Sequence, residues 1–256
     1  MPQYNPDFIL PTLARKPDTA HPYDEEFDEG TTLDAVWNAR KVNSSGVMSI
    51  ITMSSDVCSR YNDSSEFRIN VNSAQRPSFL RAQPMNGDNN NGIWRTVTVP
   101  DNFLIYVRLT FDQDHSINQS PEGFTGISLH EADSGDPSIP AHGGNGVFVG
   151  MFQAPGSQEN APYMNKSVAG GSPTSHYGDP REAEGSAIEY LALHKVGTTY
   201  YGWAGTESNW VLIGSFTGVS YNMTHFVFSF QDKLGDPTRV YGVDFIRFLE
   251  TDKFPF

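Results

Sequence analysis

Short runs in which apolar and polar residues alternate recur along most of the chain. The clearest extends from Phe103 to Phe111, where every odd position is apolar while Arg108 and Thr110 lie on the other face. A period of two is typical of a β-strand with one buried face. Further strands are predicted at residues 47–53, 94–99, 147–152, 210–216, 226–230 and 243–249. Segments rich in Gly, Asn and Asp separate these runs and are typical of turns.

Residues 187–201 allow two interpretations. Ala187 to Lys195 contains good helix formers and would make a helix of roughly two turns. The run continues directly into Val196-Gly197-Thr198-Thr199-Tyr200-Tyr201, where the glycine favours a tight turn. The β-branched and aromatic residues that follow favour a strand. We therefore predict a hairpin of two strands here.

The first 24 residues differ from the rest of the chain. They hold five of the 17 prolines, and their only apolar cluster is Phe8, Ile9 and Leu10. Because proline at this density blocks helices and central strands, we predict an extended arm over residues 1–24, with a disordered terminus as the alternative. Residues 25–256 show no linker and are expected to form a single domain. Within it, residues 154–184 are rich in Gly, Ser, Pro and Asn and are predicted to be a long loop.

Composition restricts the cellular compartments and the classes of binding partner that can be expected. Seventeen Lys and Arg against 30 Asp and Glu give a net charge of −13, which argues against nucleic acid and anionic membranes as partners. The 23 Gly and 17 Pro disfavour long helices. One cysteine, Cys58, excludes an internal disulfide and a multi-cysteine metal site. The first residues lack a signal-peptide pattern and no apolar run is long enough for a membrane span, so neither secretion by that route nor membrane insertion is expected.

Three segments resemble the concanavalin-A-like sandwich domains of phage virion proteins and glycan-binding modules. Residues 24–37, D-E-E-F-D-E-G-T-T-L-D-A-V-W, are similar to the opening of that group. Residues 190–216 resemble its hairpins, and residues 242–248 look like its last strand. The resemblance implies a two-sheet antiparallel sandwich. The expected fold is therefore an all-β, concanavalin-A-like jelly roll with an extended N-terminal arm.

Aromatic residues are the main candidates for a binding role. In such a sandwich Trp37, Trp94, Trp203 and Trp210 would mostly fill the space between the sheets or cover a sheet edge. The functional alternative is stacking on a sugar ring. Tyr200, Tyr201 and Trp203 are the best candidates for stacking because they lie close together in one predicted hairpin.

Catalytic and metal-binding patterns are weak. Glu26-Phe27-Asp28-Glu29 is the nearest match to the carboxylate strand of glycan hydrolases with this fold, but Asp28 and Glu29 would point to opposite faces of a strand. His130 to Asp133 lacks the second histidine of a zincin motif, and we interpret it as a solvated acidic loop. No cofactor is expected. Calcium is the alternative, with oxygen ligands from Asp112, Asp114 and Asn118, or from Asp88, Asn89 and Asn91.

Together these features predict a non-enzymatic structural protein of a tailed-bacteriophage virion, made in the host cytoplasm. Its expected partners are other virion proteins of the capsid, neck or tail, host surface glycans, and further copies of the chain in a homo-oligomer. Apolar residues at both ends would make the docking contacts, namely Phe8, Ile9, Leu10, Phe254 and Phe256. The alternatives are a carbohydrate-binding module or lectin, and a glycoside hydrolase or lyase of the same fold.

Overall fold

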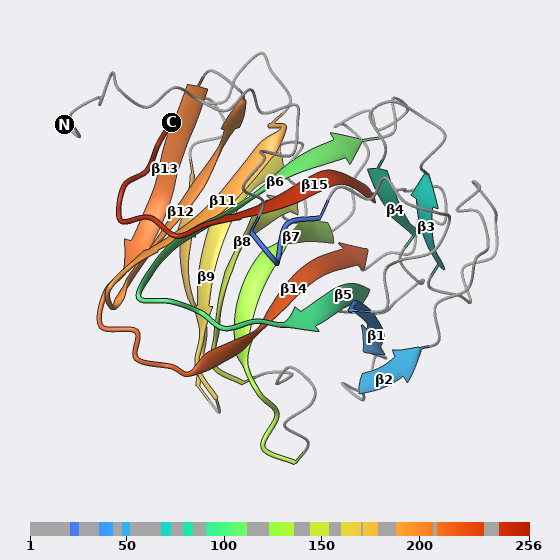
Figure 1. The fold of residues 1–256 in the computed structure, drawn as a ribbon, viewed down its shortest axis with the longest axis horizontal. Helices are drawn as coiled ribbons and strands as arrows, with labels where there is room; N and C mark the ends of the chain where they lie inside the picture. Colours follow the sequence, from blue (N-terminus) through green and yellow to red (C-terminus); the bar gives the residue numbers. More distant parts are fainter. Residues whose placement is uncertain are drawn as a thin grey trace.

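The protein is a sandwich of two antiparallel β-sheets, seen in a computed structural model of the chain (Figure 1). All the elements in its described part are strands. No helix in that part has the length and hydropathy needed to cross a membrane. The residues described are 21–25, 36–42, 48–51, 68–72, 79–83, 91–111, 123–135, 144–153, 160–169, 171–178, 188–206, 209–232 and 241–256.

Among the described residues, the larger sheet has eight strands, with β10 and β2 at its edges. In spatial order they are β10 (Thr174–Tyr177), β9 (Asn160–Ser167), β8 (Gly146–Gln153), β7 (Gly123–Glu131), β14 (Met223–Asp232), β5 (Asn91–Thr96), β1 (Asn38–Val42) and β2 (Met48–Ile51).

The smaller sheet has seven strands within the described part of the chain, with β13 and β3 at its edges. Their spatial order is β13 (Asn209–Phe216), β12 (Thr199–Thr206), β11 (Tyr190–Val196), β6 (Asn102–Phe111), β15 (Tyr241–Leu249), β4 (Phe79–Gln83) and β3 (Arg68–Asn72).

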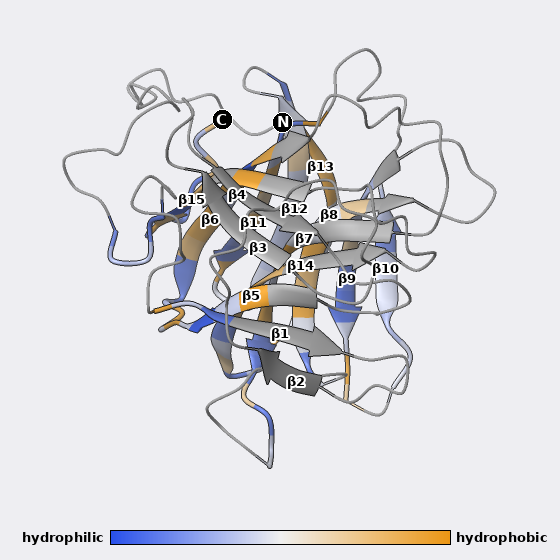
Figure 2. Cartoon of the chain, turned by 90° about the vertical axis from the view of Figure 1, so that its right-hand side faces the viewer, coloured by the Kyte–Doolittle hydropathy of each residue, from blue (hydrophilic) through white to orange (hydrophobic). Residues whose placement is uncertain are grey.

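The hydrophobic core lies between the two sheets. In β6 the alternation seen in the sequence places Phe103, Ile105 and Val107 in this core. From the facing sheet, Phe226 and Phe228 of β14 are fully buried against them. Hydrophobic stretches of the central strands are orange in Figure 2. The packing between the sheets therefore follows directly from the period-two pattern.

Residues 21–25 pack on the sandwich, although the sequence placed residues 21–24 in the arm. Glu25 forms an isolated antiparallel bridge with Ile246 of β15, with N–O distances of 3.0 and 2.9 Å. The indole nitrogen of the buried Trp37 donates a hydrogen bond to Glu25 Oε2 at 2.8 Å. The first and last segments of the family resemblance are thus adjacent in space.

Most of the fold prediction is confirmed, including the all-β class and the hairpin of β11 and β12 around Gly197, whose φ of 58° suits a tight turn. Two predictions are wrong. Residues 154–184 are not one long loop, because they contain β9 and β10. His130 and Glu131 are not in a loop, because they end β7. The arm residues Phe8, Ile9 and Leu10 lie outside the described part of the chain.

Candidate functional site

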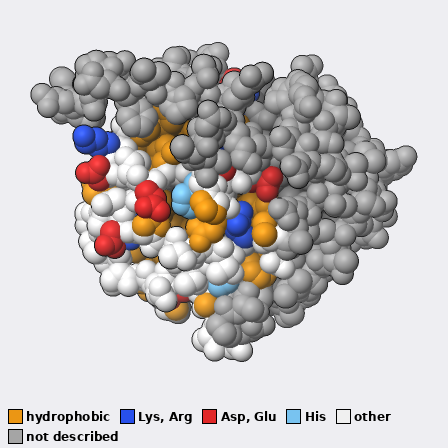
Figure 3. Space-filling view, viewed as in Figure 1, with side chains coloured by type: hydrophobic (Ala, Val, Ile, Leu, Met, Phe, Trp, Pro, Cys, Tyr) orange, Lys and Arg blue, Asp and Glu red, His pale blue; other side chains and the backbone are white. Residues whose placement is uncertain are grey.

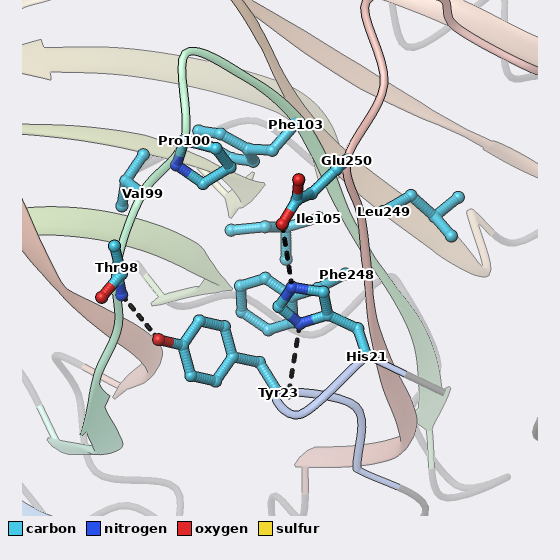
Figure 4. A pocket seen from close by; sticks show the side chains of 10 residues that line it. All are labelled: His21, Tyr23, Thr98, Val99, Pro100, Phe103, Ile105, Phe248, Leu249 and Glu250. Atoms are coloured by element: carbon cyan, nitrogen blue, oxygen red, sulfur yellow. Dashed lines mark hydrogen bonds and ion pairs between the residues drawn. The ribbon is translucent and has the colours of Figure 1, made fainter. Parts of the chain in front are cut away.

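A shallow depression lies where residues 21–23 meet β15 and the connection between β5 and β6 (Figure 4). It encloses about 240 Å³, including open solvent at its mouth. The ring of His21 stacks on Phe248 with a centroid distance of 5.7 Å, and the edge of Tyr23 meets Phe248 at 5.2 Å. Figure 3 shows this side of the molecule, where a histidine, hydrophobic groups and acidic groups lie close together at the surface.

Hydrogen bonds fix this depression in place. Tyr23 Oη accepts from the backbone N–H of Thr98 at 2.7 Å, and His21 Nε2 lies 3.7 Å from a Glu250 carboxylate oxygen. Asp24 accepts from the backbone N–H of Phe248 at 2.8 Å. Burial raises the pKa of Asp24, and this hydrogen bond works in the opposite direction. Because it has room for only about one water molecule, the depression anchors the segment at residues 21–25 rather than holding a ligand.

The aromatic residues singled out in the sequence lie on opposite faces of the seven-stranded sheet. Tyr200 faces the core, where it is 1% exposed and packs edge-on against Phe103. Its burial raises the pKa of its hydroxyl and leaves no face of its ring for a sugar. Tyr201 and Trp203 alternate with it and lie on the outer face. The structure therefore separates Tyr200 from the other two.

Phe254 and Phe256 contact other parts of the same chain. Phe254 stacks on Trp203 at 4.0 Å between centroids, and Phe256 stacks on Trp210 at 4.9 Å. Phe256 also meets the edge of Tyr106 at 5.2 Å. These two rings, expected to dock on a partner, are engaged within the chain in this structure.

The polar groups considered for catalysis or metal binding lie apart from one another or outside the described residues. Glu131 accepts hydrogen bonds from Asn145 Nδ2 at 2.7 Å and from the backbone of Asn222 at 3.0 Å, so its carboxylate is part of a local network. No group of three or more His, Cys, Asp or Glu suitable for a metal is found among the residues described. Outside them lie Glu26 to Glu29 and five of the six suggested calcium ligands: Asp88, Asn89, Asp112, Asp114 and Asn118.

The outer face of the eight-stranded sheet is more polar than a core-facing surface. Strand pairing aligns one row across it, which runs through Trp94, Val227, Ser128, Phe148, Asn165 and Ser175. A neighbouring row contains Gly92, Gly126, Gly150, Tyr163 and Tyr177. In the centre of the sheet Trp94, Val227 and Ser128 are buried, whereas toward β10 the side chains reach solvent.

We call the open part of this face the edge surface, defined by Phe148, Tyr163, Asn165, Ser175 and Tyr177. Tyr177 is 60% exposed, and its ring lies 5.1 Å from that of Tyr163. The amide of Asn165 donates to Tyr163 Oη and, at 3.1 Å, to Ser175 Oγ. Tyr163 Oη and Ser175 Oγ lie 3.1 Å apart and complete a triangle of polar groups.

Backbone geometry positions these side chains. Met164 and His176 point inward, so Tyr163, Asn165, Ser175 and Tyr177 share the outer face of β9 and β10. A side chain at Gly126 would place its Cβ 2.8 Å from Phe148 Cζ and 2.3 Å from a backbone oxygen of Val149. Glycine at this position therefore makes room for the ring of Phe148.

The edge surface combines an exposed aromatic ring with uncharged hydrogen-bonding groups held by one another. An aromatic ring offers a flat apolar face, and fixed hydroxyl and amide groups give direction to a ligand's hydroxyls. Sequence reasoning missed this surface because it lies in the segment interpreted as a loop. A signal was present, since Tyr163 and Asn165, and likewise Ser175 and Tyr177, are spaced two apart as on one face of a strand.

Comparison with known proteins finds likeness in structure only. No protein-family model matches the chain, and no curated protein matches it. The GH43 protein BlXynB of Bacillus licheniformis has a TM-score of 0.58 at 13% identity, covering 89% of this chain and 39% of that chain. A xylan β-1,4-xylosidase from Bacillus halodurans C-125 has a TM-score of 0.52 at 15% identity, covering 94% of this chain and 41% of that chain. The exoplasmic/lumenal domain of VIP36, in its form bound to Ca²⁺ and Man3GlcNAc, has a TM-score of 0.48 at 12% identity, covering 74% of this chain and 84% of that chain.

These neighbours correct the prediction that the chain is not an enzyme. That prediction rested on weak catalytic patterns in the sequence, and it is contradicted because similar folds occur in a GH43 protein and in a xylan β-1,4-xylosidase. At 13% and 15% identity the likeness shows the fold alone. The chain spans about two fifths of these enzymes, 39% and 41% of their length, so their activity is not carried over. The comparisons give no support to a phage particle.

Proposed function

We propose that this chain is a carbohydrate-binding β-sandwich, and that its edge surface holds a neutral sugar. The observation that carries the proposal is the exposed ring of Tyr177 beside the hydrogen-bonded group of Tyr163, Asn165 and Ser175. A pyranose has a C–H face that can lie against the ring of Tyr177 while its hydroxyls exchange hydrogen bonds with the neighbouring polar groups.

Three properties of the edge surface support this ligand class. None of its five side chains carries a charge at neutral pH, which suits a neutral ligand better than an ionic one. Its polar groups bond to one another, so they are already oriented before a ligand arrives. Its position on paired strands keeps the spacing between the two tyrosine rings fixed.

The fold is consistent with the proposal. A GH43 protein and a xylan β-1,4-xylosidase are similar to this fold, with TM-scores of 0.58 and 0.52. Those proteins act on carbohydrate, which gives the proposal its context, although the fold by itself hosts many functions.

Binding of neutral oligosaccharides tests the proposal directly. Xylohexaose, mannohexaose and cellohexaose are titrated into the full chain by isothermal calorimetry. We expect Tyr177→Ala to weaken binding at least about tenfold, equivalent to about 1.4 kcal/mol. Tyr177→Phe retains the ring and should keep most of the affinity.

Val36→Ala is the matched control, because Val36 is 46% exposed and lies just before β1, toward the opposite edge of the same sheet from β10. Its affinity should equal that of the wild type. Equal binding by wild type and Tyr177→Ala, or no binding to any neutral glycan, contradicts the proposal. Reducing-sugar release in the same mixtures separately measures hydrolysis.

Attachment to a virion through residues 1–24 stays a prediction. Its docking residues Phe8, Ile9 and Leu10 lie outside the described part of the chain, and Phe254 and Phe256 pack on Trp203 and Trp210. Detection of the chain by mass spectrometry in purified phage particles, lost on deletion of residues 1–20, would support it. If the chain is still found in particles after the deletion, attachment does not depend on the arm and that part of the prediction is wrong.

A further inference from the structure

The outer face of the seven-stranded sheet carries a second aromatic surface, which a segment of the chain covers. Trp203 of β12 and Trp210 and Leu212 of β13 form this surface, called here the tryptophan platform. Leu212 is the register partner of Trp203, and Trp210 pairs with Gly205. The covering segment, residues 250–256, is called the strap. Figure 1 shows it as the last red stretch, which leaves β15 and crosses toward β12 and β13.

The strap contacts the platform through parallel aromatic stacking. The rings of Phe254 and Trp203 are 4.0 Å apart and inclined by 11°, and those of Phe256 and Trp210 are 4.9 Å apart and inclined by 17°. Local hydrogen bonds stabilise the conformation of the strap. Thr251 Oγ1 donates to the carbonyl of Lys253 and accepts from the N–H of Lys253, both at 3.1 Å. Two flat rings therefore occupy two tryptophan faces.

Three buried nitrogen atoms near the strap lack a hydrogen-bond partner among the described residues. Trp203 Nε1, Trp210 Nε1 and His194 Nε2 are buried and have no hydrogen-bond partner within the described part of the chain. His194 is 4% exposed, and its ring lies 6.0 Å from that of Phe254. Phenylalanine rings cannot accept conventional hydrogen bonds from these groups. Buried donors without partners are uncommon in folded proteins, so each needs an explanation.

We propose that the tryptophan platform is a second carbohydrate-binding surface and that the strap occupies it until a sugar displaces Phe254 and Phe256. A pyranose would stack on one indole face as a phenyl ring does. Because each indole N–H lies in the plane of its own ring, the oxygens of that pyranose would accept from the N–H of the neighbouring tryptophan. This extends the proposed carbohydrate binding to the opposite side of the molecule, although the platform shares no residue with the edge surface.

The unsatisfied donors also discriminate between ligands. A strap from a second copy of the chain would bring the same two phenyl rings and would leave the same donors without partners. The rings of an aromatic peptide would likewise offer no conventional hydrogen-bond acceptor to the indole N–H groups. A sugar combines an apolar face with oxygen acceptors around its rim, so it suits both features of the platform.

Removing the two phenyl rings of the strap tests the proposal. The variant Phe254→Ser/Phe256→Ser is titrated with the neutral oligosaccharides xylohexaose, mannohexaose and cellohexaose. While Phe254 and Phe256 cover the platform, its apparent affinity is the intrinsic affinity multiplied by the fraction of molecules in which the platform is open. Removing the cover should therefore make binding at least about tenfold tighter than in wild type. Adding Trp203→Ala should abolish this gain, whereas adding Tyr177→Ala should leave it intact.

The outcomes separate this proposal from the edge surface. Binding by the strap variant but not by wild type supports the platform and contradicts the edge surface. A folded strap variant with wild-type affinity, or a gain that persists with Trp203→Ala, overturns the platform. A change in oligomeric state, or binding of the peptide acetyl-Phe-Pro-Phe-amide, without sugar binding also overturns it.

A second measurement covers the case in which the strap variant does not fold. Hydrogen exchange of wild-type residues 251–254 is followed at saturating oligosaccharide. Displacement of the strap should make these amides exchange at least about tenfold faster. Unchanged or slower exchange on binding overturns the proposal.

Discussion

The two outer faces of the sandwich differ in how they meet solvent. On the eight-stranded sheet, the edge surface exposes Tyr177, and its polar groups bond to one another. On the seven-stranded sheet, Trp203 and Trp210 are covered by the strap, and their indole nitrogens have no partner among the described residues. The difference shows that a polar aromatic surface can face water as it stands, whereas a continuous apolar aromatic surface is covered by the chain.

The faces lie on opposite sides of one end of the sandwich. His176 of β10 points inward and packs on Phe216 of β13 at 4.7 Å between centroids. Gly214 makes this approach possible, because a Cβ there would lie 2.6 Å from the ring of His176. Substitutions in the shared core should therefore affect both faces, while substitutions on either face should affect that face alone.

The largest effect is expected from the shared core. Phe228→Ala removes a side chain that is 0% exposed, and we expect the free energy of unfolding to fall by about 3–5 kcal/mol. Urea denaturation measures the loss, with Val36→Ala as the exposed control. A loss below about 1 kcal/mol would show that this core is not closely packed.

A smaller effect is expected from the strap. Phe254→Ala removes a half-buried ring that stacks on Trp203, and we expect a loss of about 1–2 kcal/mol in the free energy of unfolding. The fluorescence of Trp203 should shift to longer wavelength as the indole meets water. An unchanged emission spectrum would mean that the strap does not shield the platform in solution.

The pH dependence of stability should distinguish the covered face from the open one. Burial lowers the pKa of His194 from its usual value of 6.5, although contact with the Thr251 backbone and the charge of Asp252 oppose the shift. The unfolded chain therefore binds this proton more readily than the folded chain. The stabilising contribution is present above pH 6.5 and decreases as the pH falls through 6.5 toward the folded-state pKa.

Denaturation at pH 7.5 and pH 5.5 measures this contribution. We expect wild type to lose more stability between the two pH values than His194→Gln, whose side chain does not titrate. Tyr177→Ala keeps His194 and should follow wild type. Equal losses in wild type and His194→Gln would contradict the assignment to His194.

The smallest effect on stability is expected at the edge surface. Tyr177→Ala removes an exposed ring, and the free energy of unfolding should change by less than about 0.5 kcal/mol. Apart from this small change in stability, Tyr177→Ala should affect sugar binding alone. A loss above about 1 kcal/mol would show instead that Tyr177 stabilises β10 against β9.

Several strands that face the core on one side were predictable because their alternation is local, whereas the central strand β7 was not predicted. Phe103 to Phe111 and Phe226 to Phe230 carry apolar residues at every second position, and both lie in central strands. The strand β9 escaped prediction because its sequence, Asn160 to Ser167, has few apolar residues and contains Pro162. The strand β9 lies next to the edge strand β10, and its contribution to the hydrophobic core is Met164, so burial leaves little pattern to detect.

The candidate binding residues were predictable only in part. Alternation alone places Tyr200 and Trp203 on opposite faces of one strand, but it does not show which face is buried. Tyr200 faces the core because β12 lies within a sheet that packs on Met164 and Val149, which a Cβ at Gly202 would approach to 2.9 Å. Tyr163 and Tyr177 come together through strand pairing, which short-range patterns do not reveal.

The sequence by itself determined the all-β class, the hairpin at Gly197 and the core-facing positions of strands such as β6 and β14, because turn residues and period-two alternation act over a few neighbouring residues. Tertiary structure decided the state of each aromatic residue. Tyr200 is buried, Trp203 is covered by Phe254, and Tyr177 is exposed. These outcomes depend on segments that are distant in sequence, since the strap reaches β12 from about fifty residues away. Contacts of that range arise only when the two sheets have formed.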